Sequence, residues 1–264
     1  EVIMDRKLMP ALFVGHGSPM NVLEDNKYTR LWTTLGETLP KPKAILVISA
    51  HWYTQGTYIT AMTHPKTIHD FYGFPPELYQ IEYPAKGSIG LVALIEDLID
   101  PMKLKLDMEQ WGFDHGSWGI LEKMYPNANI PVVQLSIDAN QSPQWHYEFG
   151  KKLVELRREG VLVIGSGNIV HNLRMMDWQN DQAEPYSWAL SFSETVERCL
   201  QSDKVPEALF TILSTQEGQL AHPTAEHFLP ALYLLGLKQP DEKVTLLNND
   251  IINKSLSMMT FQIG

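Results

Sequence analysis

Short apolar runs alternate along the chain with segments in which apolar residues recur every three or four positions. Runs of strand length are found at Ala11–Val14, Ala44–Ala50, Tyr58–Met62, Leu104–Asp107, Val132–Ile137, Val161–Gly165, Val244–Leu247 and Leu256–Phe261. Helical spacing is found at Leu91–Ile99, Leu121–Tyr125, Trp145–Arg158, Tyr186–Leu200 and Leu229–Leu235. This alternation is typical of a sheet covered by helices, so the sequence predicts an α/β fold.

The segment Trp145–Arg158 has the clearest helical pattern. Helical geometry places four of its apolar residues on one face, namely Trp145, Phe149, Leu153 and Leu156. Ser142 and Pro143, directly before the segment, favour the start of a helix there. We therefore predict one continuous amphipathic helix.

A long connection, His64–Pro84, interrupts the alternation. A connection of that length inside a compact domain is usually a functional loop or a lid. No internal repeat, low-complexity run or charged block marks a linker between domains. We therefore expect one domain over residues 1–264.

The net charge and the length of the apolar runs narrow the class of protein. The formal charge of −10 argues against a nucleic-acid partner, because phosphate binding depends on lysine and arginine. No run approaches the roughly 20 consecutive apolar residues of a membrane-spanning helix, and the N-terminal segment does not resemble a secretory signal. The single cysteine, Cys199, excludes an intramolecular disulfide and multi-cysteine metal sites, so the cytoplasm is the expected compartment.

Five of the nine histidines occupy special positions. His16 and His51 directly follow predicted strands, and His171 follows a third strand after a short turn. His115 lies in a glycine-rich turn that opens a predicted helix, and His227 lies in or just before the start of another helix. Because ligands of open α/β sheets bind outside the carboxyl ends of the strands, the first three histidines point to one edge of the sheet.

Two interpretations of these positions stay open from the residues alone. A single histidine after a strand is more often a hydrogen-bonded turn residue than a ligand. Neutral imidazole is nonetheless the commonest transition-metal ligand, and a catalytic metal needs roughly three protein ligands and an open position. The chain has neither a nucleophile elbow nor a phosphate-binding loop, so a metal centre is the leading catalytic hypothesis.

Other histidines and the cysteine are expected to be structural. His146 is predicted to lie on a helix surface, and His222 in a turn before a proline. Cys199 lies within the predicted helix Tyr186–Leu200. His69 is the exception, because it lies in the long connection.

Seven segments occur in the same order as in a known enzyme family. They are LFVGHGSPMN, VISAHW, TIHDFYGFP, WGFDHGSW, QLSID, SGNIVHNLR and PTAEHFLPALYLLG. In these segments the chain resembles the class III extradiol ring-cleavage dioxygenases of the LigB-like superfamily, and within it the 4,5-DOPA dioxygenase type. Seven ordered segments are far more specific than any single motif.

The resemblance implies a three-layer α/β/α sandwich around a mixed β-sheet, with one divalent metal and neither haem nor flavin. Carried onto this sequence, His16, His51 and His227 would be metal ligands. His171 would be either a further metal ligand or the catalytic acid/base residue beside the metal. His115 would be a catalytic group that faces the substrate without binding the metal.

The resemblance also implies that the substrates are O2 and a catechol, L-DOPA or a similar compound. His69, Tyr72 and Trp118 are expected to contact the aromatic ring. An all-histidine site would bind zinc readily, so we expect Fe(II) in the working enzyme and Zn(II) as an occupant of purified protein.

Several alternatives stay open at this stage. A zinc-dependent hydrolase of an amide or ester on the same scaffold is one, and a metal-binding protein without activity is another. Asp114 and Asn168 are candidates for orienting imidazoles, and Arg174 is either a partner for a substrate carboxylate or a surface residue. The oligomeric state is open as well.

Overall fold

A computed structural model describes residues 7–264 of the chain. The strands of its central sheet are β1 (Ala11–Gly15), β2 (Ala44–Thr54), β3 (Tyr58–Thr60), β5 (Lys105–Asp107), β7 (Val132–Asp138), β8 (Val161–Gly167), β9 (Val244–Asn248) and β12 (Thr260–Ile263). Their order is β5-β3-β7-β2-β8-β1-β12-β9. Neighbours from β7 to β1 are parallel, whereas β3 and β12 are antiparallel to β7 and β1, so the sheet is mixed.

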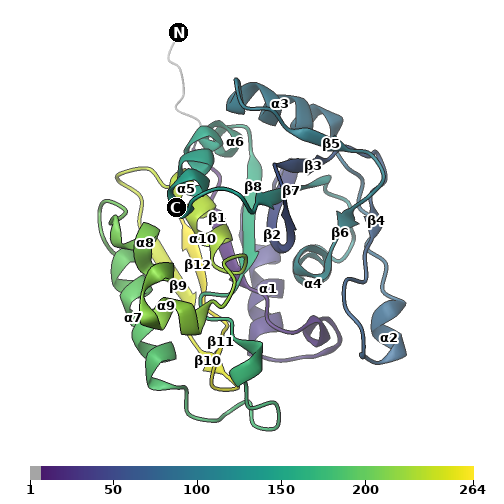
Figure 1. Cartoon of the computed structure of the whole chain (residues 1–264). Coiled ribbons are helices and arrows are strands. Elements are labelled where there is room, and N and C mark those ends of the chain that lie inside the picture. The colour runs from purple at the N-terminus through teal and green to yellow at the C-terminus, as the bar shows by residue number, and fades with distance from the viewer. Residues whose placement is uncertain (1–6) are drawn as a thin grey trace.

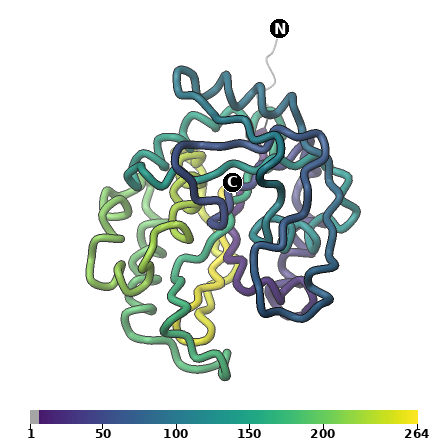
Figure 2. Tube along the Cα trace, turned by 45° about the vertical axis from the view of Figure 1, so that its right-hand side comes forward, coloured from purple at the N-terminus to yellow at the C-terminus, as the bar shows by residue number. Residues whose placement is uncertain are grey.

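Helices cover both faces of this sheet and give three layers (Figure 1). They are α1 (Lys27–Thr38), α2 (Pro76–Tyr79), α3 (Ile89–Ile99), α4 (His115–Met124), α5 (Pro143–Lys152), α6 (Val154–Arg158), α7 (Ser187–Leu200), α8 (Ala208–Thr211), α9 (Gln216–Ala221) and α10 (Leu229–Leu237). α5 and α10 lie on one side of the central strands, and α1 and α4 lie on the other. In the turned view of Figure 2, green C-terminal segments are separated in the same way from purple and blue N-terminal ones. The predicted α/β/α sandwich is confirmed.

Successive residues of the central strands enter two separate cores. The core beside α5 and α10 contains Phe13, Leu46, Ile48 and Val163. The core beside α1 and α4 contains Leu12, Val14, Ile45, Val47, Leu162 and Ile164. Because both faces of these strands are buried, the strands appear in the sequence as continuous apolar runs, and such runs are the signal that predicted them.

Helix α1 has no counterpart among the predicted elements. Its N-cap is Asn26, whose side chain accepts hydrogen bonds from the backbone N–H groups of Tyr28 and Thr29. The helix buries Trp32 and Leu35 in the core beside α1 and α4. Few of its residues are apolar, so the capping pattern was the usable sequence signal.

The predicted helix Trp145–Arg158 is wrong in one respect, because it divides into α5 and α6. At Leu153 the backbone N–H donates to the carbonyl of Gly150, which closes a tighter turn than an α-helix makes. Leu153 and Leu156 still pack into the same core as Phe149. The apolar spacing therefore predicted the buried face correctly, but it did not predict that the helix is interrupted at Leu153.

The long connection His64–Pro84 is partly ordered by short elements. It contains β4 (Lys66–Thr67), which pairs with β6 (Gly112–Phe113), and it also contains α2. Leu78 and Tyr83 are buried, and the Tyr83 hydroxyl donates to the carbonyl of Tyr125. These contacts fix the connection against α4 and the segment that follows it.

His146, predicted on a helix surface, and His222, predicted in a turn, are both buried. His146 is fully buried, and its Nδ1 lies 2.8 Å from the hydroxyl of Tyr233 on α10. His222 donates through Nε2 to the carbonyl of Ile169 at 2.6 Å. The surface placement of His146 is therefore wrong, because α10 covers the face of α5 that carries it.

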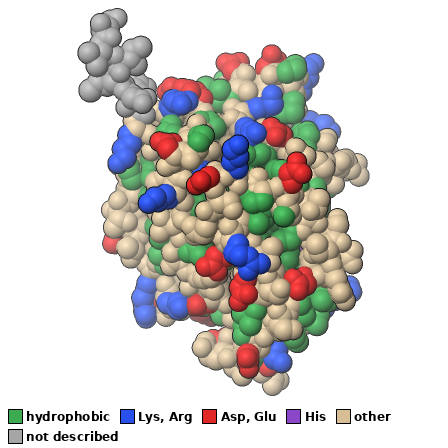
Figure 3. Space-filling model, turned by 90° about the vertical axis from the view of Figure 1, so that its left-hand side faces the viewer, with side chains coloured by type: hydrophobic (Ala, Val, Ile, Leu, Met, Phe, Trp, Pro, Cys, Tyr) green, Lys and Arg blue, Asp and Glu red, His purple; other side chains and the backbone are tan. Residues whose placement is uncertain are grey.

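The surface carries charges of both signs. Acidic and basic side chains are interspersed over the face shown in Figure 3. Within residues 7–264, no helix combines the length and the apolar character needed to cross a membrane. Residues 1–6, which begin the segment where no secretory signal is predicted, lie outside the described residues.

Close packing of α5 against α10 should make Gly150→Ala strongly destabilising. A Cβ atom at Gly150 would overlap the backbone carbonyl of Tyr233. We expect the free energy of unfolding to fall by about 3 kcal/mol, the upper end of typical overpacking costs. Gly90→Ala on α3 is the control, because its Cβ would meet only the Ser88 hydroxyl at 3.9 Å. Equal stability of the two variants in chemical denaturation would contradict this packing.

Burial of His146 predicts a loss of stability in acid. Desolvation disfavours the charged imidazole and lowers the pKa of His146 from 6.5 to about 4. The unfolded chain then binds more protons than the folded one as the pH falls from 6.5 to about 4, so the folded state loses stability across that window. We expect this residue to account for roughly 3 kcal/mol of that loss.

The measurement is denaturant unfolding of the wild type and of His146→Gln at several pH values in this window. The stability difference between the two proteins should shift in favour of the variant as the pH falls. The same substitution at the exposed His64 is the matched control. Parallel stability profiles for the wild type and His146→Gln would refute the assignment.

Candidate metal centre

Three neighbouring parallel strands bring histidines to one edge of the sheet. β1 ends at Gly15 and is followed by His16, and His171 follows β8 after a short turn. His51 lies within β2 rather than after it, because the strand continues past an irregularity to Thr54. The predicted end of this strand at Ala50 is therefore wrong, although His51 still lies at the predicted edge.

Strand alternation explains why these polar side chains share one face. The apolar residues of the core beside α4 are followed, at steps of two, by polar ones: Leu12 and Val14 by His16, Ile45 and Val47 by Ser49 and His51, and Leu162 and Ile164 by Ser166. Successive side chains of a strand point to opposite faces, so each series stays on one face. The core beside α4 thus passes directly into the histidine cluster.

Five imidazoles lie together at this edge. His16 and His51 have ring centroids 4.9 Å apart, and their Nε2 atoms are separated by 3.0 Å. His115 lies 3.9 Å from His51, and His227 lies 5.0 Å from it, both between ring centroids. The ring of His171 stacks on that of His227 at 3.5 Å. One potential ligand atom from each of His16, His51 and His115 lies within 4.8 Å of the other two, so these three could hold a metal ion.

Hydrogen bonds determine which nitrogen of His16 is free. Its Nδ1 lies 2.9 Å from the hydroxyl of Ser166, and this hydroxyl donates its own proton to the carbonyl of Gly116. The Ser166 oxygen must therefore accept from His16, so Nδ1 carries the proton in the neutral ring. The lone pair of His16 is left on Nε2, which faces His51.

Asp70 orients His115 and was not among the predicted site residues. One carboxylate oxygen accepts from Nδ1 of His115, and the other accepts from its backbone N–H, both at 2.9 Å. Burial alone would raise the pKa of Asp70, but the hydrogen bonds from His115 and the charge interactions with His115 and His51 together hold that pKa below its ordinary value. The segment HDFYG contained this signal, since carboxylates commonly orient functional imidazoles.

His227 has the environment expected of a ligand. Both of its ring nitrogens are buried, and neither has a hydrogen-bond partner among residues 7–264. The backbone carbonyl of His227 accepts from the N–H of Asn168, which fixes the turn before α10. Unpartnered buried nitrogen costs free energy, and a metal ion would satisfy it. The residues present therefore fit a metal ion.

The cluster is electrostatically suited to neutral imidazoles. Burial is the largest cause that lowers the pKa of His16, His51 and His227 well below 6.5. Burial likewise lowers the pKa of His171 to about 4. Metal ligation requires the unprotonated ring, so these side chains are in the binding form at neutral pH.

Asp114 supports the cluster indirectly. It is fully buried, and it accepts hydrogen bonds from Ser49, Trp111 and Gln134. Burial raises the pKa of Asp114 to about 6. Neither Asp114 nor Asn168 contacts an imidazole through its side chain in the described hydrogen bonds, so their predicted direct role is wrong. Asp114 acts through Ser49, whose hydroxyl also accepts from the N–H of His51 at 3.2 Å.

The histidines open onto a cavity of about 200 Å³. Its other walls come from backbone and apolar side chains: Gly17, Ser18, Pro19, Phe74, Leu173, Met176, Trp178 and Leu256. His69, Tyr72 and Trp118, the predicted substrate contacts, are outside this lining. His69 donates to the carbonyl of Ile81, Tyr72 is 92% exposed, and Trp118 donates to the carbonyl of Ile68. Their contact with substrate stays a prediction, and Phe74 is the lining residue from the same loop.

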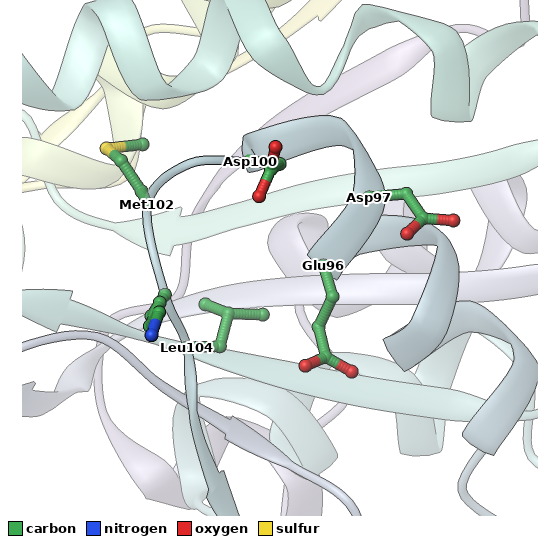
Figure 4. A pocket seen from close by; sticks show the side chains of 6 residues that line it. Glu96, Asp97, Asp100, Met102 and Leu104 are labelled. Carbon is green, nitrogen blue, oxygen red and sulfur yellow. The ribbon is translucent and has the colours of Figure 1, made fainter.

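A larger hollow lies beside the end of α3, away from the histidines. It has a volume of about 430 Å³ and is lined by Glu96, Asp97, Asp100, Met102, Lys103 and Leu104. Its three carboxylates point in different directions around the helix end (Figure 4). Since they do not converge on one point, we place the chemistry at the histidine cavity.

Comparison with known proteins agrees with this site. The model of a family described as the catalytic LigB subunit of aromatic ring-opening dioxygenase matches residues 10–260. The chain belongs to the LigB family. The match spans all five clustered histidines, and enzymes of this family depend on a metal.

Relatives from bacteria and plants extend the LigB assignment. The chain is 53% identical to a 4,5-DOPA dioxygenase extradiol of Escherichia coli K12, over all of this chain and 98% of that protein. It is 37% identical to a 4,5-DOPA dioxygenase extradiol of Beta vulgaris, over 90% of each. A solved structure of an uncharacterized Escherichia coli K12 protein matches with a TM-score of 0.86 and 50% identity, over 97% of this chain and all of that one. This LigB member is an extradiol ring-cleaving dioxygenase, and the hydrolase alternative is not favoured.

The hydrogen bonds to His115 predict that Asp70→Asn lowers turnover. The negative charge of Asp70 holds the proton on Nδ1 of His115. The amide of asparagine keeps the shape of the carboxylate but not this charge. We expect kcat for ring cleavage to fall roughly 10–100-fold, as when partners of functional histidines are removed. Asp97→Asn in the acidic hollow is the matched control. Unchanged kcat in the Asp70 variant, with metal content and melting temperature also unchanged, would rule out this role.

Proposed function

We propose that this protein opens the ring of a catechol with O2 at a metal held by His16, His51 and His227. One observation carries the ligand assignment: both ring nitrogens of His227 are buried without a hydrogen-bond partner among the described residues, and its ring centroid lies 5.4 Å from that of His16 and 5.0 Å from that of His51. Relatives at up to 53% identity are named for cleavage of DOPA, so L-DOPA is the first compound to test. We further propose a single domain, because eight strands, of which β1 is the first and β12 the last along the chain, form one sheet.

Fe(II) is the metal we propose for the working enzyme. When bound to His16, His51 and His227, it would supply a Lewis acid that lowers the pKa of the catechol hydroxyls and the redox chemistry that activates O2. Zn(II) lies above Fe(II) in the usual order of affinity, so it is expected to occupy the same imidazoles in purified protein. All donors assigned here are neutral nitrogens, which suit both metals.

His115 is the residue we assign to proton transfer. Its Nδ1 donates to Asp70, so in the neutral ring Nε2 is free to accept a proton from a catechol hydroxyl. The adjacent carboxylate stabilises the imidazolium that forms. His171, stacked on His227, is the second candidate for acid/base work or for a fourth ligand position.

Separate substitutions should distinguish ligands from the acid/base group. His227→Ala is expected to lose bound Fe(II) and all oxygen uptake. His115→Gln should retain Fe(II) and lose roughly 10²–10⁴-fold in kcat, the usual contribution of general acid–base catalysis. The measurement is metal content after anaerobic reconstitution, followed by oxygen uptake with L-DOPA and a panel of catechols.

Each outcome of this experiment has a defined meaning. Loss of metal in His115→Gln with retention in His227→Ala would assign the ligands to His16, His51 and His115 instead. His64→Ala, at an exposed position, is the matched control. No oxygen uptake with any catechol in the Fe(II)-loaded wild type would disprove the proposed function.

A further inference from the structure

Three of the clustered imidazoles turn the same ring nitrogen, Nδ1, toward an oxygen acceptor. Nδ1 of His16 lies 2.9 Å from the hydroxyl of Ser166. Nδ1 of His115 lies 2.9 Å from a carboxylate oxygen of Asp70, and Nδ1 of His51 faces the same oxygen at 3.8 Å. The other nitrogens of His16 and His51, their Nε2 atoms, face each other at 3.0 Å. The cluster is therefore built with Nδ1 toward oxygen acceptors and with these two Nε2 atoms toward each other.

His227 has an acceptor in the equivalent place, the carboxylate of the preceding residue. Oε1 of Glu226 lies 3.5 Å from Nδ1 of His227. The imidazole is 6% exposed and the carboxylate 20% exposed, so water competes little for this contact. A hydrogen bond of ordinary length, about 2.7–3.2 Å, needs a shift of only a few tenths of an ångström. A neutral imidazole has one N–H group and one lone pair, so an Nδ1–H directed at Glu226 leaves the lone pair on Nε2.

The carboxylate of Glu226 is itself incompletely satisfied. Its Oε1 accepts a hydrogen bond from the hydroxyl of Thr224 at 2.9 Å, which holds the side chain in place. Its Oε2 is buried and has no hydrogen-bond partner among residues 7–264. A buried carboxylate oxygen without a donor costs free energy, and the unpartnered Nδ1 of His227 lies beside this carboxylate. The two unsatisfied groups can therefore satisfy each other.

We infer that Glu226 is the positioning residue of His227: its carboxylate accepts the Nδ1 proton and thereby holds Nε2 as the metal-binding nitrogen. The inference rests on the proposed function, which makes His227 a ligand, and it adds the residue that fixes the tautomer of this ligand. Ligating histidines usually donate their other ring N–H to a carboxylate, a carbonyl or water, which orients the ring and raises its basicity. Glu226 is outside the lining of the cavity, so it acts through His227 and not on the substrate.

Affinity for Zn(II), measured by competition with a chelator, tests this role without catalytic turnover. We expect Glu226→Ala to weaken Zn(II) binding about 10–100-fold, the usual loss when such a partner of a ligand is removed. Glu226→Gln should lose less affinity than Glu226→Ala, because its amide carbonyl still accepts an N–H although the negative charge is gone. Equal affinity of the wild type and Glu226→Ala would overturn the inference.

Glu217→Gln is the matched control for the affinity series. Glu217 is also half-buried, and its carboxylate accepts a hydrogen bond from the hydroxyl of Ser191 at 3.0 Å. No histidine within residues 7–264 pairs with Glu217, so this variant should bind Zn(II) as tightly as the wild type. Loss of binding to the level of His227→Ala in both Glu226 variants would make the carboxylate itself a ligand, which contradicts the inference.

Nuclear magnetic resonance of isotope-labelled histidines distinguishes positioning from a general loss of structure. At saturating Zn(II), the Nδ1 proton of His227 should give a downfield signal that exchanges slowly with water. This signal should disappear or move upfield in Glu226→Ala, while the signal of His115, which donates to Asp70, should stay. An unchanged His227 signal would overturn the inference. Neither readout uses a catechol, so failure of the proposed reaction would show only in oxygen uptake, and failure of this inference only in Zn(II) affinity and the His227 signal.

Discussion

Burial of several neutral imidazoles in one place is the constraint on which this site depends. Protonation of any one would put a charge in a desolvated cluster beside other rings, and for His16 and His227 neighbouring histidines lower the pKa further. A neutral ring has one N–H group and one lone pair to satisfy, and the described residues leave both nitrogens of His227 without a hydrogen-bond partner. A metal ion bound to one nitrogen of each ligand ring would accept its lone pair and favour the neutral form, so the cluster and a bound ion would stabilise each other.

The sheet supplies the rigidity that such a cluster needs. His16 and His51 extend the faces of β1 and β2 whose earlier residues fill the core beside α4. Their positions therefore follow from strand register and not from a mobile loop. Ser166 and Asp70 then fix the proton on His16 and on His115, so that the free nitrogens face the interior. Apolar side chains, among them Phe74 and Leu173, line the other side of the cavity.

The loops that follow the strands supply both imidazoles and residues of the cavity wall. The turn after β8 carries His171 and then the short 3-10 helix η2 (Leu173–Met175), so one segment supplies both an imidazole and the apolar wall residues. The connection between β3 and α3 supplies Asp70 and Phe74 in the same way. We expect substrate specificity to differ among such enzymes through the sequences of these loops, because the edge of the sheet is occupied by the histidines.

The sequence by itself determined the α/β class, most strands and the five clustered histidines. Buried parallel strands are continuous apolar runs, and three of the histidines, His16, His51 and His171, follow the ends of those runs. It did not predict α1, because few residues of that helix are apolar, or the break at Leu153, because the apolar spacing continues through it. The burial of His146 depends on a helix distant in the chain. Only the tertiary structure decided that Asp70 pairs with His115, across 45 positions, and that the cavity wall is uncharged. Spacing along a chain predicts which edge of a sheet a residue occupies, but not which side chains from other loops meet it there.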